Sequence, residues 1–424
     1  MKRYLTSLLF IGLLFLFSIP SLLTAQDTVV PPPVGFRPDA PMYALNGSYW
    51  VGTQTFVGED VDGPLDIRVW YPALNPSGVE GDITYIMHWK AEGLGLEYDQ
   101  TLVNIAGHAI DGADVDLSGA PYPLVVLSHG HNSESPFYAW LAERVASYGF
   151  VVIAPDHKEQ NTPGWTDGPR TTLARPVTIS HTIDYAETLT AENGALAGMI
   201  DMEHIAMMGQ SGGGTTTLSV AGGRFDMDGF VTYCATVTED SPPAYQNACT
   251  PNPEYVQTEM ARILGLDSIP EGLWLAMSDP RVDVAIPMSS EGHFFNEAGL
   301  AEITMPILIM GGTRDNSVPY DWSVRPVYDY VSSQQKILVT FEYADHFIFA
   351  PTCEDAPTTM ELLGGYFYYL CSDAVWDLDR AHDLINHFVI AFLLAELKGD
   401  GDAASALAVD AVSFSGITYE AEGF

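Results

Sequence analysis

The sequence predicts an α/β protein with a mostly parallel central sheet and helices on both faces. From Tyr122 onward, short apolar runs of strand length alternate with longer segments of helical character. Several of these runs, such as Pro123–Ser128 and Phe150–Ala154, are continuously apolar, which is typical of strands buried on both faces. Because strand, helix and strand follow one another in this order, successive strands should lie parallel.

Each element of this prediction has a local basis. The stretches at Tyr49–Val57 and Leu65–Tyr71 alternate between apolar and polar residues, so we expect strands with one partly exposed face. The remaining strands are expected at 123–128, 150–154, 205–209, 282–288, 306–310 and 336–343. Helices are expected at 137–148, 177–192 and 215–221, and a last one spans 381–395. This last segment is apolar all round at its centre, which favours a buried core helix over membrane contact.

Composition limits the classes of function. The chain has 424 residues, of which 47% are hydrophobic, enough for a substantial core. Its 55 acidic and 17 basic residues give a formal charge of −38, a field that repels nucleic acid and anionic membranes. We therefore expect no nucleic-acid partner.

The N-terminus indicates export. Lys2 and Arg3 precede an apolar run from Leu8 to Ile19, and Ala25 is a plausible last residue of a signal peptide spanning 1–25. Leu23 does not fit the small-residue position, so an uncleaved membrane anchor stays open. No later stretch is long enough to span a bilayer, and we expect a secreted, periplasmic or extracellular protein.

The rest of the chain is expected to form one large domain. A Pro-rich, extended segment at 26–48 leads into a domain at 49–424. Two parts of this domain are longer than simple connections, and we interpret them as insertions at about 75–120 and 225–280.

Four cysteines in an exported chain suggest disulfides. The simplest of the three possible connectivities pairs Cys234 with Cys249 and Cys353 with Cys371, closing two short loops. The alternative is four buried thiols.

The stretch Ile205–Gly214 has the layout of a nucleophile elbow. An apolar strand ends in Gly209-Gln210-Ser211-Gly212-Gly213, a Gly-x-Ser-x-Gly pattern, and helix-compatible residues follow. Such a turn exposes a serine hydroxyl beside backbone N–H groups, and it needs small residues where strand and helix approach each other. An ordinary turn serine is the alternative.

Other polar residues follow the ends of the predicted strands, where parallel sheets carry their chemistry. A nucleophilic serine needs a histidine base, and the base needs a carboxylate to orient it. Asp315 and His346 each follow a strand, and the chain order Ser211, Asp315, His346 is the one used with this elbow. Asp345 and Asp283 are rivals for the acid; the alternatives are a loop-capping aspartate and a packed histidine.

The turn at His129-Gly130-His131 suggests an oxyanion hole. Acyl transfer needs two backbone donors, and we expect the N–H groups of Gly212 and His131 to supply them. Metal binding competes with this interpretation but lacks a full ligand signature, so we expect no metal or cofactor. Its possible ligands are His129, His131, Asp156, His157 and His293.

Aromatic residues near the site are candidates for substrate contact. Trp165, Phe347 and Phe349 follow strand ends, and Gln210 adjoins the nucleophile. The 225–280 insertion carries Tyr233, Tyr245, Tyr255 and Trp274 with two of the cysteines. It could form a disulfide-pinned cover over an acyl pocket, or its aromatics could pack only among themselves.

These stretches resemble the α/β-hydrolase superfamily, and more closely its platelet-activating-factor acetylhydrolase-like and dienelactone-hydrolase-like branch, which includes secreted polyester hydrolases. The resemblance covers about residues 49–400. It implies an α/β-hydrolase fold with Ser211, Asp315 and His346 as the triad, and His131 and Gly212 as oxyanion donors. Two features depart from it: true dienelactone hydrolases use a cysteine nucleophile, and Gln210 replaces the common histidine.

The expected function is that of a secreted serine hydrolase, which cleaves carboxylic esters through the triad and an acyl-enzyme, without a cofactor. The expected substrates are small-molecule or lipid esters, with short acyl groups or of lipid or polyester type. We expect neutral or zwitterionic esters to be preferred, and activity to fall with acid around or somewhat below neutral pH as His346 protonates. A catalytically silent binding protein and a metal-dependent hydrolase are the alternatives.

Overall fold

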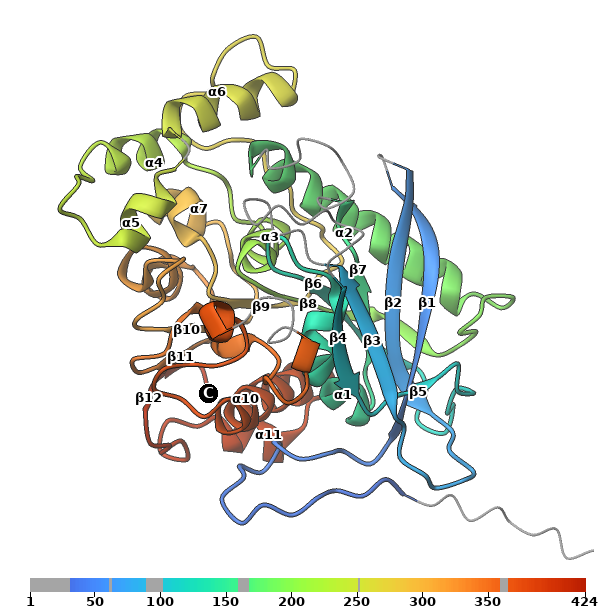
Figure 1. The fold of residues 1–424 in the computed structure, drawn as a ribbon. Helices are drawn as coiled ribbons and strands as arrows, with labels where there is room; N and C mark the ends of the chain where they lie inside the picture. The colour runs from blue at the N-terminus through green and yellow to red at the C-terminus, as the bar shows by residue number, and fades with distance from the viewer. Residues whose placement is uncertain (1–30, 61–62, 89–101, 159–167, 251, 359–364) are drawn as a thin grey trace, which may run out of the picture.

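The computed structural model describes residues 31–60, 63–88, 102–158, 168–250, 252–358 and 365–424 (Figure 1). The predicted signal peptide and Trp165 therefore lie outside the described residues.

A ten-stranded sheet, in the order β12-β11-β10-β9-β8-β6-β7-β2-β1-β5, forms the centre of the fold. From β7 to β11 in this order, all neighbouring strands are parallel. The antiparallel pair β1–β2 extends one side, and β12 pairs antiparallel with β11 at the other edge. The strands are β1 (Trp50–Asp60), β2 (Gly63–Ala73), β5 (Ile110–Asp111), β6 (Tyr122–Ser128), β7 (Val151–Pro155), β8 (Ile200–Gln210), β9 (Val284–Met288), β10 (Ile307–Gly312), β11 (Lys336–Phe341) and β12 (Ile417–Glu422).

Helices cover both faces of this sheet, which confirms the predicted fold class. On β6, Val125 and Leu127 belong to the core shared with α1 (Ala139–Ser147) and α10 (Leu378–Lys398). The alternate residues Leu124 and Val126 pack instead with α2 (Gly168–Thr190) and α3 (Gly212–Val220). Apolar side chains on both faces explain why these strands are continuously apolar in sequence.

The predicted helices are present, with shifted boundaries. Helix α2 begins nine residues before the predicted start at 177, and it runs through Pro176. That proline favours a helix start, because it lacks an N–H, but the packed helix tolerates it. Helix α10 begins where the Asp377 carboxylate accepts the Arg380 N–H at 3.0 Å and ends at Gly399 in the left-handed conformation.

Some elements were not predicted. Strands β3 (Ile83–His88) and β4 (Leu102–Gly107) form a separate antiparallel pair within the 75–120 insertion, and β12 adds a C-terminal edge strand. Further helices are α4 (Met227–Cys234), α5 (Pro243–Ala248), α6 (Pro253–Ile263), α7 (Asn296–Leu300), α8 (Arg325–Tyr330) and α11 (Gly401–Ala406). Short 3₁₀ segments stand at Ser135–Tyr138, Gly292–Phe294, His346–Phe349 and Gly365–Leu370, and a π-helical turn stands at Tyr320–Val324.

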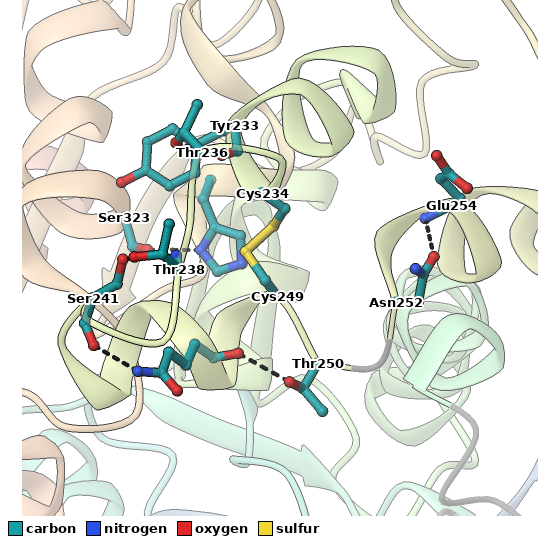
Figure 2. Close-up of a disulfide and its surroundings, with 12 residues drawn as sticks. Tyr233, Cys234, Thr236, Thr238, Ser241, Cys249, Thr250, Asn252, Glu254 and Ser323 are labelled. Carbon is teal, nitrogen blue, oxygen red and sulfur yellow. Dashed lines mark hydrogen bonds between the residues drawn. A yellow bond between two sulfur atoms is a disulfide. The ribbon is translucent and has the colours of Figure 1, made fainter.

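Helices α4, α5 and α6 form the 225–280 insertion and lie together at one end of the molecule, beside α3 and α7 (Figure 1). The predicted disulfide between Cys234 and Cys249 is formed and joins the last residue of α4 to the residue after α5 (Figure 2). Helix α6 packs on α2 and α4. The second predicted pair, Cys353 and Cys371, is also bonded.

Within the described part of the chain, no helix combines the length and apolar character that a membrane crossing requires.

Candidate active site

Ser211 lies at the turn between β8 and α3 in a backbone conformation that L-residues rarely adopt, with φ 57° and ψ −124°. Two glycines allow this turn. A Cβ on Gly209 would come within 2.4 Å of the Gly213 carbonyl oxygen, and one on Gly213 within 2.0 Å of the Ser128 carbonyl oxygen. The Gly-x-Ser-x-Gly spacing therefore forms the sharp strand-to-helix turn of a nucleophile elbow.

Asp315 and His346 come together as a hydrogen-bonded pair. His346 Nδ1 lies 2.7 Å from Asp315 Oδ2, and both residues are buried. The other oxygen, Asp315 Oδ1, accepts the backbone N–H groups of Ser317 at 2.8 Å and Val318 at 2.7 Å. The carboxylate is thus fixed on both sides, and its acceptor oxygen selects the tautomer of His346 that carries its proton on Nδ1.

Electrostatics keep His346 basic. Burial alone would lower the pKa of His346, but the charge of Asp315 and the hydrogen bond to it outweigh burial, with smaller contributions from Asp345 and Glu291. The pKa of His346 is therefore raised above its ordinary value of 6.5. A raised pKa makes Nε2 a stronger proton acceptor.

The rival aspartates have other partners. Asp345 accepts the backbone N–H groups of His346 and Asn316, which caps the short helical turn at His346. Asp283 Oδ2 accepts the Ile205 N–H at 2.8 Å, in the middle of β8 and away from Ser211 at its C-terminal end. Of the three candidates, Asp315 alone contacts the His346 ring in the described structure.

The two predicted oxyanion donors lie beside each other. The His131 backbone nitrogen is 3.5 Å from the position that a Cβ on Gly212 would take. Behind them, Arg175 on α2 is buried and donates from Nη1 to the His129 carbonyl at 2.6 Å and from Nη2 to the Gly130 carbonyl at 3.2 Å. In a trans peptide the N–H and C=O point in opposite directions, so holding the Gly130 carbonyl also aims the His131 N–H.

The ring of His129 adds to this restraint. His129 Nε2 accepts the His157 backbone N–H at 2.9 Å, which leaves Nδ1 protonated to donate to the Gly130 carbonyl at 2.8 Å. Burial, followed by the charge of Arg175, holds the pKa of His157 well below its usual range, and His157 Nε2 lies 2.8 Å from the Ser128 hydroxyl.

Three of the histidines considered as possible metal ligands already have hydrogen-bond partners within the protein. His129 and His157 are engaged with the backbone and with Ser128, and His293 Nδ1 pairs with Ser323. Across the residues that the structure describes, no three His, Cys, Asp or Glu side chains converge as a metal site.

Two hollows meet at Ser211, and Ser211 and His131 line both of them. We call the first the cover hollow; it has a volume of about 380 Å³ and lies between α2, α3 and the insertion of α4 to α6. We call the second the base hollow; it has a volume of about 240 Å³ and contains His346. The base hollow is lined also by Met87, Gly130, Asn132, Ser133, Phe137, Tyr138, Gln210, Phe347, Tyr369 and Leu370.

The predicted substrate contacts have mixed outcomes. Phe347 lines the base hollow and packs edge-on against His346 and Tyr369. Gln210 also lines it, although its Nε2 lies 3.2 Å from His346 Nε2 and its Oε1 accepts the Tyr138 hydroxyl at 2.8 Å. Phe349 was wrongly predicted to line the site: it is buried in the core against Phe341.

The insertion contacts the cover hollow through residues other than those expected. Tyr233, which Figure 2 draws near the disulfide, stacks on Trp322 with ring centroids 3.6 Å apart. Tyr245 stacks against both of these rings at longer distances. Tyr255 is exposed and Trp274 is buried. The insertion residues that line the hollow are Phe230, Asn247, Ala248, Thr250, Val256 and Met260.

Sequence reasoning missed Arg175, Glu291 and Tyr138. Arg175 contacts residues about 46 positions away, and Glu291 contacts Thr215 across 76 positions. Glu291 follows Ser289 and Ser290 at the end of β9, so the strand-end rule could have identified it. No sequence signal indicated the other two.

Comparisons with known proteins find similarity to several families of esterases. Residues 116–269 match the sequence model of the chlorophyllase family, and residues 34–167 match that of platelet-activating factor acetylhydrolase, isoform II. A cutinase from Thermobifida alba, est2, is 36% identical over 110 residues, which are 25% of this chain and 32% of the cutinase. Cutinase cut1 from Thermobifida fusca is 34% identical over 110 residues, 25% of this chain and 30% of that protein.

The similarity of fold to one solved structure covers most of both chains. A ferulic acid esterase from Streptomyces cinnamoneus superimposes with a TM-score of 0.52 and 19% identity, covering 88% of this chain and 96% of the esterase. The chain has the α/β-hydrolase fold. Its family and sequence matches fall among esterases of that superfamily, and the likeness to the acetylhydrolase branch expected from the sequence is confirmed. The matched region spans about a third of the length of the cutinases.

Proposed function

We propose that this chain is a serine hydrolase of carboxylic esters that works through an acyl-enzyme. The observation that carries the proposal is the meeting of Ser211, on its strained turn, with the Asp315–His346 pair at one hollow, beside two backbone donors. The cutinase, acetylhydrolase and ferulic acid esterase likenesses support ester hydrolysis as the reaction class.

In the first step, His346 Nε2 takes the proton of the Ser211 hydroxyl as its oxygen attacks the ester carbonyl carbon. The carbonyl oxygen becomes an oxyanion, which accepts the N–H groups of His131 and Gly212. Asp315 stabilises the imidazolium that forms and keeps the ring oriented. The tetrahedral intermediate then collapses, and the alcohol leaves with the proton that His346 holds.

In the second step, water replaces the alcohol. His346 takes a proton from the water as it attacks the acyl carbonyl carbon, and the same two N–H groups bind the second oxyanion. Collapse releases the carboxylic acid, and the proton returns from His346 to the Ser211 oxygen. Every proton is transferred by a group of the chain or by water, so the reaction needs no cofactor.

Gln210 has a place in this scheme. Its amide nitrogen lies within hydrogen-bonding distance of His346 Nε2, and its amide oxygen is held by Tyr138, whose hydroxyl accepts the Gly130 N–H at 3.0 Å. We assign Gln210 to orienting the base, with substrate contact secondary. When Ser211 passes its proton to Nε2, the amide has to give way to the serine.

The test is labelling with a fluorophosphonate, which reacts with an activated serine. We expect wild type to be labelled and to release alcohol from a short-chain ester in the presence of EDTA. Ser211→Ala should not be labelled, and its kcat should be lower by about 10⁴-fold or more. Circular dichroism should show that this variant keeps the wild-type fold.

Two other outcomes would replace the proposal. Activity that EDTA abolishes, without labelling, would favour a metal-dependent hydrolase. A folded, disulfide-bonded protein that is neither labelled nor active on any ester would be a silent α/β-hydrolase that only binds its ligand.

Export of the protein is part of the proposal. Two disulfides are formed and no free cysteine remains among the described residues, which fits an oxidising compartment. N-terminal sequencing of the mature protein from its native host would test cleavage after Ala25.

A further inference from the structure

The chemistry of ester cleavage assigns each half of the substrate to one hollow, given the function proposed above. The leaving oxygen has to receive its proton from His346 Nε2, so the alcohol half belongs in the base hollow, which His346 lines. The acyl half stays attached to Ser211. It takes the remaining direction, into the cover hollow, which His346 does not line.

The cover hollow has an apolar part and a polar part. Phe230, Val256, Met260 and Phe294 form apolar walls. Near the nucleophile, the lining changes to Thr215, Thr216, Arg175 and Glu291. The hollow is thus built for an acyl group that is apolar in one part and polar in another.

Glu291 is the carboxylate in this lining, and its position is fixed. Its backbone N–H donates to the Thr215 hydroxyl oxygen at 3.1 Å, and that hydroxyl donates to Glu291 Oε2 at 3.0 Å. The Thr215 hydroxyl is also 3.3 Å from the Ser211 carbonyl oxygen. A single hydroxyl therefore separates the carboxylate from the backbone of the nucleophile.

The cation in the same lining does not neutralise this carboxylate by direct contact. Arg175 directs Nη1 and Nη2 to the carbonyl oxygens of His129 and Gly130, and no ion pair joins it to Glu291 in the described structure. Within the same described residues, no donor reaches Glu291 Oε1. A half-buried carboxylate at the wall of a binding hollow is a strong acceptor for a ligand donor.

We propose that the preferred substrates are esters whose acyl half carries a hydrogen-bond donor, a hydroxyl or an ammonium group, that Glu291 accepts. The donor belongs on the first few carbons of the acyl chain, because Glu291 lies so close to the nucleophile. Acyl groups that end in a carboxylate are disfavoured by repulsion from Glu291.

Four ethyl esters with the same alcohol test this proposal: butyrate, 3-hydroxybutyrate, 3-aminobutyrate and the monoester of succinate. Ethanol release gives kcat/KM for each ester with wild type, Glu291→Gln and Glu291→Leu. The readout is the ratio of each ester to butyrate within one protein sample, so a partly folded variant does not distort it. Glu297→Gln, on the exposed start of α7, removes the same charge away from the hollow and is the matched control.

Wild type should prefer the hydroxy and amino esters over butyrate by about tenfold or more, a typical effect of a charge-assisted hydrogen bond. Glu291→Gln keeps an acceptor oxygen, so it should retain the hydroxyl preference, lose the ammonium preference and accept succinate better. Glu291→Leu should lose both preferences, and Glu297→Gln should behave as wild type.

The proposal is overturned if wild type hydrolyses butyrate as well as both donor-bearing esters, or if Glu291→Leu keeps their advantage. Either result leaves ester hydrolysis intact. Failure to hydrolyse all four esters, together with absence of fluorophosphonate labelling, would instead overturn the proposed function itself.

Discussion

Two side chains converge on the single peptide between Gly130 and His131. The Gly130 carbonyl accepts from Arg175 Nη2 and from the His129 ring, and the His131 nitrogen of the same peptide lies near Gly212. An oxyanion donor stabilises a transition state only if it is already aimed when charge develops. At the residue scale, we therefore propose that Arg175 positions the oxyanion donor.

Replacing Arg175 should lower kcat with little change in KM. We expect Arg175→Met to reduce kcat by about 10- to 100-fold, and Arg175→Lys to recover part of the loss, because lysine keeps the charge but cannot hold two carbonyls. A boronic acid that mimics the tetrahedral intermediate should lose affinity in parallel with kcat. Arg170→Met, an exposed site on the same helix, serves as control. A folded Arg175→Met with wild-type kcat would contradict this role.

The pH profile should report His346. The neutral imidazole is the active form, and its pKa is raised, so kcat/KM should fall with acid through a single ionisation centred above 6.5. Asp315→Asn removes the largest of the effects that raise this pKa and leaves burial, which lowers it. The acid limb should then move to lower pH while kcat drops by about 10⁴-fold. Activity of wild type that is unchanged down to about pH 4 would exclude a histidine base.

At the scale of elements, each disulfide borders one hollow. Cys249 directly follows Asn247 and Ala248, which line the cover hollow, and Cys371 directly follows Tyr369 and Leu370, which line the base hollow. The sequence separations are similar, 15 and 18 residues, so removal of either bond should cost a similar free energy of unfolding. Their effects on substrate choice should differ.

Two double variants, each lacking one of the disulfides, test this difference. Cys234→Ser with Cys249→Ser should lower stability by about 3 kcal/mol and alter selectivity between acyl chains. Cys353→Ser with Cys371→Ser should cost a similar amount but alter selectivity between alcohols. Thermal unfolding and a matrix of acyl and alcohol esters measure both effects. If both variants changed the two selectivities alike, the assignment of halves to hollows would be wrong.

At the scale of the whole molecule, the formal charge of −38 creates a field that every charged substrate experiences before it binds. We expect kcat/KM for an anionic ester to rise several-fold between about 10 mM and about 0.5 M salt, since screening removes repulsion. A neutral ester of the same size should be nearly insensitive over this range. Equal salt responses of the two esters would show that the field does not reach the site.

The described fold was predictable where a buried strand leaves a run of apolar residues in the sequence. The strands from β6 to β11 have buried apolar centres because helices cover both faces, and each was predicted, although β8 begins five residues before the predicted start. Strand β12 was missed: none of its residues is buried, and it carries Glu420 and Glu422. Strands β3 and β4 pair only with each other, so nothing in their alternation identifies a sheet partner.

The sequence by itself determined the kind of site that we propose. Each of the three proposed triad residues, Ser211, Asp315 and His346, follows a strand of the parallel part of the sheet. Parallel strands place their carboxyl ends at the same edge of the sheet, whatever conformation the loops adopt. Only the tertiary structure decided what surrounds them. Arg175 and Glu291 act through contacts across 46 and 76 residues, and such contacts depend on how helices and loops pack, which no local pattern encodes. The proposed reaction class therefore follows from residues that can be recognised along the chain, whereas the proposed acyl preference depends on side chains that meet only after folding.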